Sequence, residues 1–129
     1  MSVLPRAPRR APRADPGLVT TRAVLRAAVR LGVSNKALAG IIGVSEATVS
    51  RMGSGTWHLT PGDKAFELAL LFIRLFRSLD AITDGDETVA AAWLRAENRA
   101  LGQPPLALVQ TIAGLVHVLG YLDTRRSLA

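Results

Sequence analysis

Apolar side chains recur every three or four positions along most of the chain, which is the spacing of one face of an α-helix. In residues 20–31 they fall at Val24, Leu25, Ala28 and Leu31. No stretch keeps up an alternation of apolar and polar residues with a period of two, as a half-buried strand would. The pattern therefore predicts an all-α fold.

Capping residues and glycines indicate where the first helices begin and end. Ser34 and Ser45 each precede a short apolar run, and a serine in that position accepts a hydrogen bond from a free N–H group of the first helical turn. Gly43 stands between the two runs, where we expect a sharp turn with a positive φ. These signals predict two short helices separated by a turn of three residues.

Later helix starts are indicated by Thr60-Pro61 and by the capping-box spacing of Asp84 and Glu87. Gly102 then marks a helix end. We expect seven helices in all, over residues 20–31, 35–42, 46–52, 60–81, 84–101 and 104–112 and, after a kink or turn at Gly114, up to about Arg126.

The two short helices have the layout of a helix-turn-helix. An inward apolar face would hold them at a fixed angle, and it comprises Leu38, Ile42, Val44, Val49 and Met52, while the small Ala39 allows the helices to approach closely. Small and hydroxylated side chains at the start of the second helix can enter a major groove, and the N-terminus of the first suits a phosphate. We therefore expect DNA contacts from Asn35, Lys36, Ser45, Glu46, Ala47, Thr48, Ser50 and Arg51. The alternative is an ordinary helical hairpin that binds no DNA.

The fourth predicted helix is apolar nearly all round, with eleven apolar positions among the fifteen residues 65–79. A helix of this kind is buried on more than one side. One interpretation is a two-fold interface that makes the chain a homodimer, with candidate dimerisation residues Phe66, Leu70, Phe72, Ile73 and Phe76. The other is the central core helix of a small bundle.

The positive charge is concentrated at the N-terminal end. The chain carries a net charge of +6, and residues 1–30 hold seven arginines against the single acid Asp15, which accounts for the whole excess. Residues 5–17 are rich in proline and arginine and offer nothing to bury, so we expect a disordered arm. Such an arm suits phosphate contacts on DNA, or else it is a solvated tail.

Several function classes are disfavoured by what the chain lacks. It has no cysteine and only two histidines, His58 and His117, and neither stands at a catalytic or metal-ligand spacing from other residues. The acidic group around Asp84 does not match a calcium loop. No uncharged apolar run reaches the roughly 18 residues of a membrane span, and the N-terminus has no secretory apolar segment. We expect a cytoplasmic protein that is not an enzyme and has no cofactor.

The region from Asn35 to Trp57 resembles the Xre (Cro/repressor-like) helix-turn-helix family, with Ala39, Gly43 and Val49 at the spacings of that family. Further along come Trp93-Leu94, Asn98, Leu101-Gly102, Pro105-Leu106, Thr111, Gly114, Val118 and Leu122. In this order, residues 93–123 resemble the toxin-binding domain of Xre/MbcA/ParS-type antitoxins, and residues 66–80 resemble the linker helix of the same family. The resemblance, together with the two arginines near the C-terminus, indicates which residues bind the toxin. They are Trp93, Asn98, Leu101, Pro105, Leu106, Gly114, Val118, Leu122, Arg125 and Arg126.

The resemblance implies an antitoxin of a bacterial type II toxin–antitoxin pair. Its partner would be a RES-type toxin, an enzyme that consumes NAD, and the antitoxin would repress its own operon by binding operator DNA. The expected division is an arm over residues 1–17, a DNA-binding helix-turn-helix region over 18–60, a linker or dimerisation helix over 61–82 and a toxin-binding domain over 83–129. The alternative is a helix-turn-helix transcriptional regulator with no toxin partner.

Overall fold

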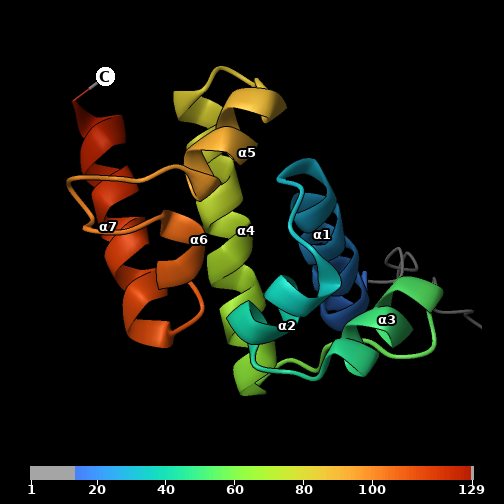
Figure 1. Cartoon of the computed structure of the whole chain (residues 1–129). Coiled ribbons are helices and arrows are strands. Elements are labelled where there is room, and N and C mark those ends of the chain that lie inside the picture. Colours follow the sequence, from blue (N-terminus) through green and yellow to red (C-terminus); the bar gives the residue numbers. More distant parts are fainter. Residues whose placement is uncertain (1–13, 129) are drawn as a thin grey trace, which may run out of the picture.

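The computed structural model describes residues 14–128, which form seven helices and no strand (Figure 1). The all-α prediction is confirmed. The helices are α1 (Pro16–Arg30), α2 (Asn35–Ile42), α3 (Glu46–Ser54), α4 (Lys64–Ile82), α5 (Glu87–Arg95), α6 (Pro105–Leu108) and α7 (Ile112–Ser127).

Helix α4 runs through the middle of the molecule, with α1 on one side and α7 on the other (Figure 1). Helix α2 also packs on α4, so three helices cover most of its surface. Phe72 and Leu75 of α4 are fully buried, and Leu79 is nearly so. Helix α4 is therefore the central core helix. Two of the predicted dimerisation residues, Phe72 and Ile73, are buried within the single chain.

The beginning of α1 corrects the predicted extent of the arm. Helix α1 begins at Pro16, and the Asp15 carboxylate accepts a hydrogen bond of 2.9 Å from the backbone N–H of Gly17. The acid-proline pair is an N-cap followed by proline in the first helical turn, a start signal that we had assigned to the arm. Residues 14–17 thus belong to the folded part, and the rest of the predicted arm, residues 1–13, lies outside the described residues.

Two other helix starts also differ from the prediction. Thr60-Pro61 lies in a turn, and α4 begins only after Asp63. Helix α5 is capped by Asp86, whose carboxylate accepts from the N–H of Val89 at 3.1 Å, whereas Asp84 has a φ of 54° in the preceding turn. In both cases an aspartate closer to the apolar run occupies the N-cap position, and only Asp86 also caps the helix with its side chain.

The C-terminal helices have different bounds from those expected. Helix α5 ends at Arg95, so Asn98 and Leu101 lie in a turn in which the Asn98 side chain accepts from the Leu101 N–H at 3.1 Å. Helix α6 is a single turn. Gly114 is not a kink between two helices, because Thr111 caps α7 by accepting from the Gly114 N–H at 3.0 Å. No helix in the described part of the chain is long and apolar enough to cross a membrane.

Candidate DNA-binding and toxin-binding surfaces

Helices α2 and α3 form the predicted helix-turn-helix. Ser34 and Ser45 cap the two helices as expected, and Gly43 ends α2 in the left-handed conformation with a φ of 74°. Leu38, Ile42 and Val49 are buried between the helices. Helix α3 continues through Gly53 to Ser54 and is closed by Gly55, also left-handed. The recognition helix is thus two residues longer than predicted.

The exposed start of α3 carries a chain of side-chain hydrogen bonds. The Ser45 hydroxyl oxygen accepts from the Thr48 N–H at 3.0 Å and lies 2.9 Å from the Thr48 hydroxyl oxygen. The Arg51 guanidinium in turn donates to the Thr48 hydroxyl at 3.2 Å. Thr48 is half-buried, while Ser45, Glu46, Ala47, Ser50 and Arg51 are exposed. The network orients Thr48 and Arg51 before any DNA arrives, which lowers the entropy that binding would cost.

The N-terminus of α2 lies exposed and carries Asn35 and Lys36. The Ser34 hydroxyl oxygen accepts a hydrogen bond of 3.1 Å from the Ala37 N–H. The N–H groups of Asn35 and Lys36 point out of the helix end. Free N–H groups and the positive end of the helix dipole suit a phosphate oxygen. All eight residues predicted to contact DNA therefore belong to α3 and its cap or to the start of α2, and none is fully buried.

The segment after α3 is anchored to α1 by one buried hydroxyl. The Thr21 hydroxyl donates to the carbonyl of Gly17 at 2.7 Å and accepts from the N–H of Leu59 at 2.8 Å. The Leu59 carbonyl lies so close to Gly17 that a Cβ atom added there would come within 2.1 Å of it. This contact fixes the C-terminal exit of the recognition helix against the first helix. No pattern in the sequence identifies this contact, because Thr21 looks like any other residue of the first helix.

The residues predicted to bind a toxin fall into two groups. In the first group, Pro105, Gly114, Val118 and Leu122 are buried in the core of the C-terminal half. Their pattern reflects packing: a Cβ atom added at Gly114 would lie 1.9 Å from the carbonyl oxygen of Leu108. The other predicted residues keep accessible surface, and they are Trp93, Asn98, Leu101, Leu106, Arg125 and Arg126.

An aromatic and basic cluster lies between α5 and α7. The rings of Trp93 and Tyr121 are stacked with centroids 6.3 Å apart, and the Arg125 guanidinium lies 5.8 Å from the Tyr121 centroid. Arg125 also donates to the Tyr121 hydroxyl at 3.0 Å. These residues line a hollow of about 250 Å³, beside which Val89 is half exposed. Stacked aromatics with an arginine are typical of protein interfaces. Tyr121 and Val89 were missed from the sequence, although Tyr121 is four residues before Arg125 and so on the same helix face.

The two C-terminal arginines lie on α7 and differ in their contacts. Helix α7 continues to Ser127, close to the predicted helix end near Arg126, so both arginines lie on its last turn. Arg126 donates to the buried Ser78 hydroxyl of α4 at 3.3 Å. Asp123, one turn earlier, forms an ion pair with Arg74 of α4. Arg125 is therefore the arginine free to meet a partner, whereas Arg126 also holds α7 to α4.

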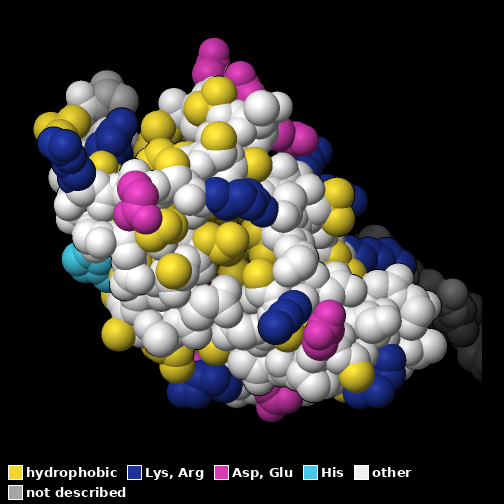
Figure 2. Space-filling view, viewed as in Figure 1, with side chains coloured by type: hydrophobic (Ala, Val, Ile, Leu, Met, Phe, Trp, Pro, Cys, Tyr) yellow, Lys and Arg dark blue, Asp and Glu magenta, His cyan; other side chains and the backbone are white. Residues whose placement is uncertain are grey.

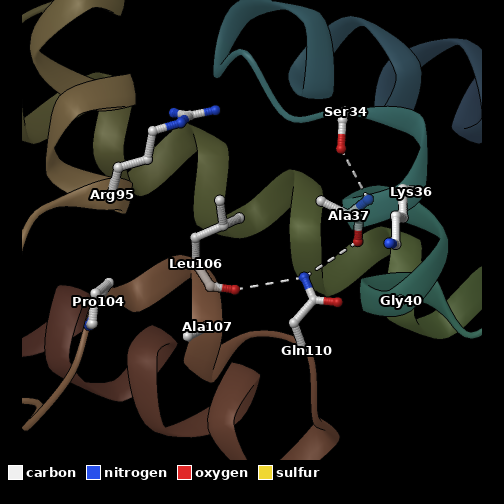
Figure 3. Close-up of a pocket in the computed structure, with 9 residues that line it drawn as sticks. All are labelled: Ser34, Lys36, Ala37, Gly40, Arg95, Pro104, Leu106, Ala107 and Gln110. Carbon is white, nitrogen blue, oxygen red and sulfur yellow. Dashed lines mark hydrogen bonds between the residues drawn. The ribbon is translucent and has the colours of Figure 1, made fainter.

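The two halves of the molecule meet at a groove between α2 and α6 (Figure 3). It has a volume of about 660 Å³ and is lined mostly by apolar atoms. The Gln110 amide donates to the Ala37 carbonyl of α2 at 3.3 Å, and the Arg95 guanidinium donates to the Leu31 carbonyl at 3.1 Å and to the Gly32 carbonyl. Figure 2 shows hydrophobic side chains gathered in the middle of this face, with basic side chains beside them. The helix-turn-helix and the C-terminal helices are thus joined by direct contacts as well as by α4.

Within residues 14–128, no three His, Asp or Glu side chains come together as a metal site would require. His58 and His117 are exposed on different parts of the chain.

Comparison with protein families gives two matches that together span most of the chain. Residues 10–74 match the antitoxin Xre-like helix-turn-helix domain, and residues 78–127 match the antitoxin Xre/MbcA/ParS C-terminal toxin-binding domain. No curated protein matches the chain. The first match covers the helix-turn-helix of α2 and α3, and the second covers the cluster of Trp93, Tyr121 and Arg125. The chain therefore belongs to the Xre/MbcA/ParS antitoxins of toxin–antitoxin systems, with a DNA-binding helix-turn-helix followed by a toxin-binding domain.

Proposed function

We propose that this antitoxin neutralises a RES-type, NAD-consuming toxin and represses the operon that encodes both proteins. The observation that carries the proposal is the presence of an exposed, pre-ordered recognition helix and a separate aromatic and arginine cluster on one rigid core. The first surface suits DNA and the second suits a protein. A regulator without a toxin partner would have no need of the second surface.

Co-expression with the adjacent reading frame tests the choice of toxin. The toxin alone should stop growth and deplete cellular NAD, and the intact antitoxin should restore both and co-purify with it. If growth stops without a change in NAD, the toxin is of another kind. If the adjacent product is harmless and does not co-purify, the alternative of a plain transcriptional regulator holds.

We assign the toxin contact to the cluster of Trp93, Tyr121 and Arg125. Arg125→Glu should weaken neutralisation because it reverses the charge of the cluster. The variant should remain folded, because the contacts of Arg125 are to Tyr121 one turn earlier on the same helix. Arg99→Glu is the matched control, since Arg99 is an exposed arginine in the loop after α5. Truncation of α7 is a poorer test, because it also removes the Arg74–Asp123 ion pair and the Arg126 contact to α4. Equal neutralisation by the Arg125 and Arg99 variants would exclude this assignment.

We propose that the operator is bound by a homodimer, since one recognition helix reads one half-site and two-fold operators match two-fold proteins. Ser50→Tyr should abolish site-specific binding to the promoter because the bulky ring cannot enter a major groove at that depth. Deletion of residues 1–13 should weaken binding to all sequences alike and reduce its salt dependence, since arginines on phosphates carry no base information. The deletion must stop before Asp15, because Asp15 caps α1.

A further inference from the structure

One part of the α4 surface is left uncovered by α1, α2 and α7, and it is lined by arginines. Two adjoining hollows follow the seam between α1 and α4, and they share Ala23, Ile73 and Arg77. Their volumes are about 460 and 180 Å³. We call the two hollows together the arginine groove. Its basic lining comprises Arg26, Arg30, Arg74, Arg77 and Arg126.

The charge of the arginine groove is only partly balanced. Arg74 pairs with Asp123, and Arg30 lies 3.5 Å from a carboxylate oxygen of Glu87. Arg26 and Arg77 form no ion pair with any residue that the structure describes. Five arginines therefore face two carboxylates, which leaves an excess of positive charge along the seam. Neither the DNA-binding surface nor the cluster around Trp93 uses these residues.

The floor and mouth of the groove are apolar. Ala23, Ala27 and Ile73 lie at its base, while Leu70 and Val19 stand at one end with about half of their surface exposed. Arginines that flank exposed aliphatic side chains suit a partner that presents carboxylates beside apolar side chains. Phosphate groups would satisfy the arginines but would leave Leu70 and Val19 in water.

The position of the groove also argues against operator DNA. Helix α3 lies at the end of the molecule where α1 and α4 begin, and α5 lies at the opposite end (Figure 1). The groove leads from Val19 toward that opposite end, where Arg30 contacts Glu87 of α5. A duplex that contacts α3 would lie at the first end, away from the end of the groove where Arg30 contacts Glu87. A second copy of the chain is disfavoured too, because a two-fold axis through the groove would oppose arginine to arginine.

We propose that the arginine groove binds an acidic amphipathic segment of a protein partner, in contact with α1 and α4. Residues 19–30 of α1 rise by about 16 Å, so the groove accommodates about three helical turns. Carboxylates of the segment pair with Arg26 and Arg77, and its apolar side chains cover Leu70 and Val19. The site is separate from both surfaces assigned above, and its test does not depend on the identity of the toxin.

The test measures fluorescence anisotropy of a labelled synthetic helix of about three turns, with glutamates and leucines on one face at helical spacing. A peptide of the same composition in scrambled order is the control probe, and a DNA duplex of unrelated sequence is the third probe. The amphipathic peptide should bind the full-length protein more tightly than the scrambled one, with an affinity that falls as salt rises. Arg26→Glu with Arg77→Glu should weaken binding by roughly tenfold or more.

Two further variants make the result specific. Leu70→Asp should also weaken binding of the amphipathic peptide. Arg99→Glu, which changes an exposed arginine outside the groove, should leave that binding unchanged. Circular dichroism confirms that each variant is folded. Absence of binding, equal binding of the scrambled peptide, or equal binding by the double variant would overturn the proposal. A loss of duplex binding alone in the double variant would overturn it in favour of nucleic acid, and a loss of self-association alone would overturn it in favour of a second copy.

Discussion

The Thr21 hydroxyl gives the sharpest test of how the recognition helix is held. Thr21→Val keeps the shape of the side chain and its β-branch but removes the acceptor of the Leu59 N–H bond, which is 2.8 Å long. Leu59 and Thr21 are both buried, so no water replaces the lost partner. The Gly17 carbonyl loses the hydroxyl but remains an acceptor in the helix.

The expected cost follows from the unpaired donor. A buried N–H without an acceptor destabilises a protein by about 1–3 kcal/mol, and helix propensity differs little between threonine and valine. A loss of about 2 kcal/mol lowers the melting temperature of a chain of this size by roughly 8 °C. Thr21→Ser keeps the hydroxyl and loses one methyl group, which costs about 1 kcal/mol. Valine should therefore be the worse substitute, although it is the closer match in volume.

Thermal unfolding by circular dichroism measures the loss, and amide hydrogen exchange at Leu59 locates it. Thr20→Val is the matched control, because Thr20 is buried on the same helix but its hydroxyl makes no hydrogen bond within the described residues. Operator affinity should fall for Thr21→Val only, since the segment after α3 loosens. If Thr21→Val melts with the parent protein and its Leu59 amide stays protected, the bridge does not hold the recognition helix.

Three further outcomes are expected. Ser45→Ala and Ser34→Ala should each lower the free energy of unfolding by about 1 kcal/mol, measured by thermal unfolding. Only Ser45→Ala should also weaken operator binding in a mobility-shift assay, because it alone releases Thr48. Equal losses of affinity would contradict this. Gly114→Ala should destabilise by about 2 kcal/mol because the rigid Leu108 carbonyl cannot move aside, and an unchanged melting temperature would refute the clash. Phe72→Asp should prevent folding while Leu70→Asp should not, as circular dichroism would show, and a folded Phe72 variant would contradict the core position.

The helix-turn-helix could be predicted from sequence almost residue by residue, because its signals are local. A serine cap and a left-handed glycine act within one turn of the helices they delimit, so Ser34, Gly43 and Ser45 identify the bounds of α2 and the start of α3. The eight candidate DNA-binding residues follow from those bounds, because helix geometry alone decides which positions face outward.

The C-terminal surface could be predicted less well, because the same spacing serves packing and recognition. Val118 and Leu122 recur at a helical interval, but the interval says only that they share a face, and the structure turns that face toward α4. Tyr121 could not be recognised as a candidate from the sequence, because its partner in the stack, Trp93, lies far away along the chain. The start of α5 could not be predicted for a similar reason. Asp84 and Asp86 both suit an N-cap, and the turn geometry around Gly85 decides between them.

Helix α4 belongs to both family regions, since the first ends at residue 74 and the second begins at residue 78, both inside Lys64–Ile82. The two activities therefore share one hydrophobic core and must unfold together. A protease that cuts α4 during a single opening of the molecule would end repression and neutralisation in one event. The lifetime of the antitoxin in the cell is then set by how stably α4 is packed in the core. For the same reason, a chimaera between two relatives should take the whole of α4 from one of them.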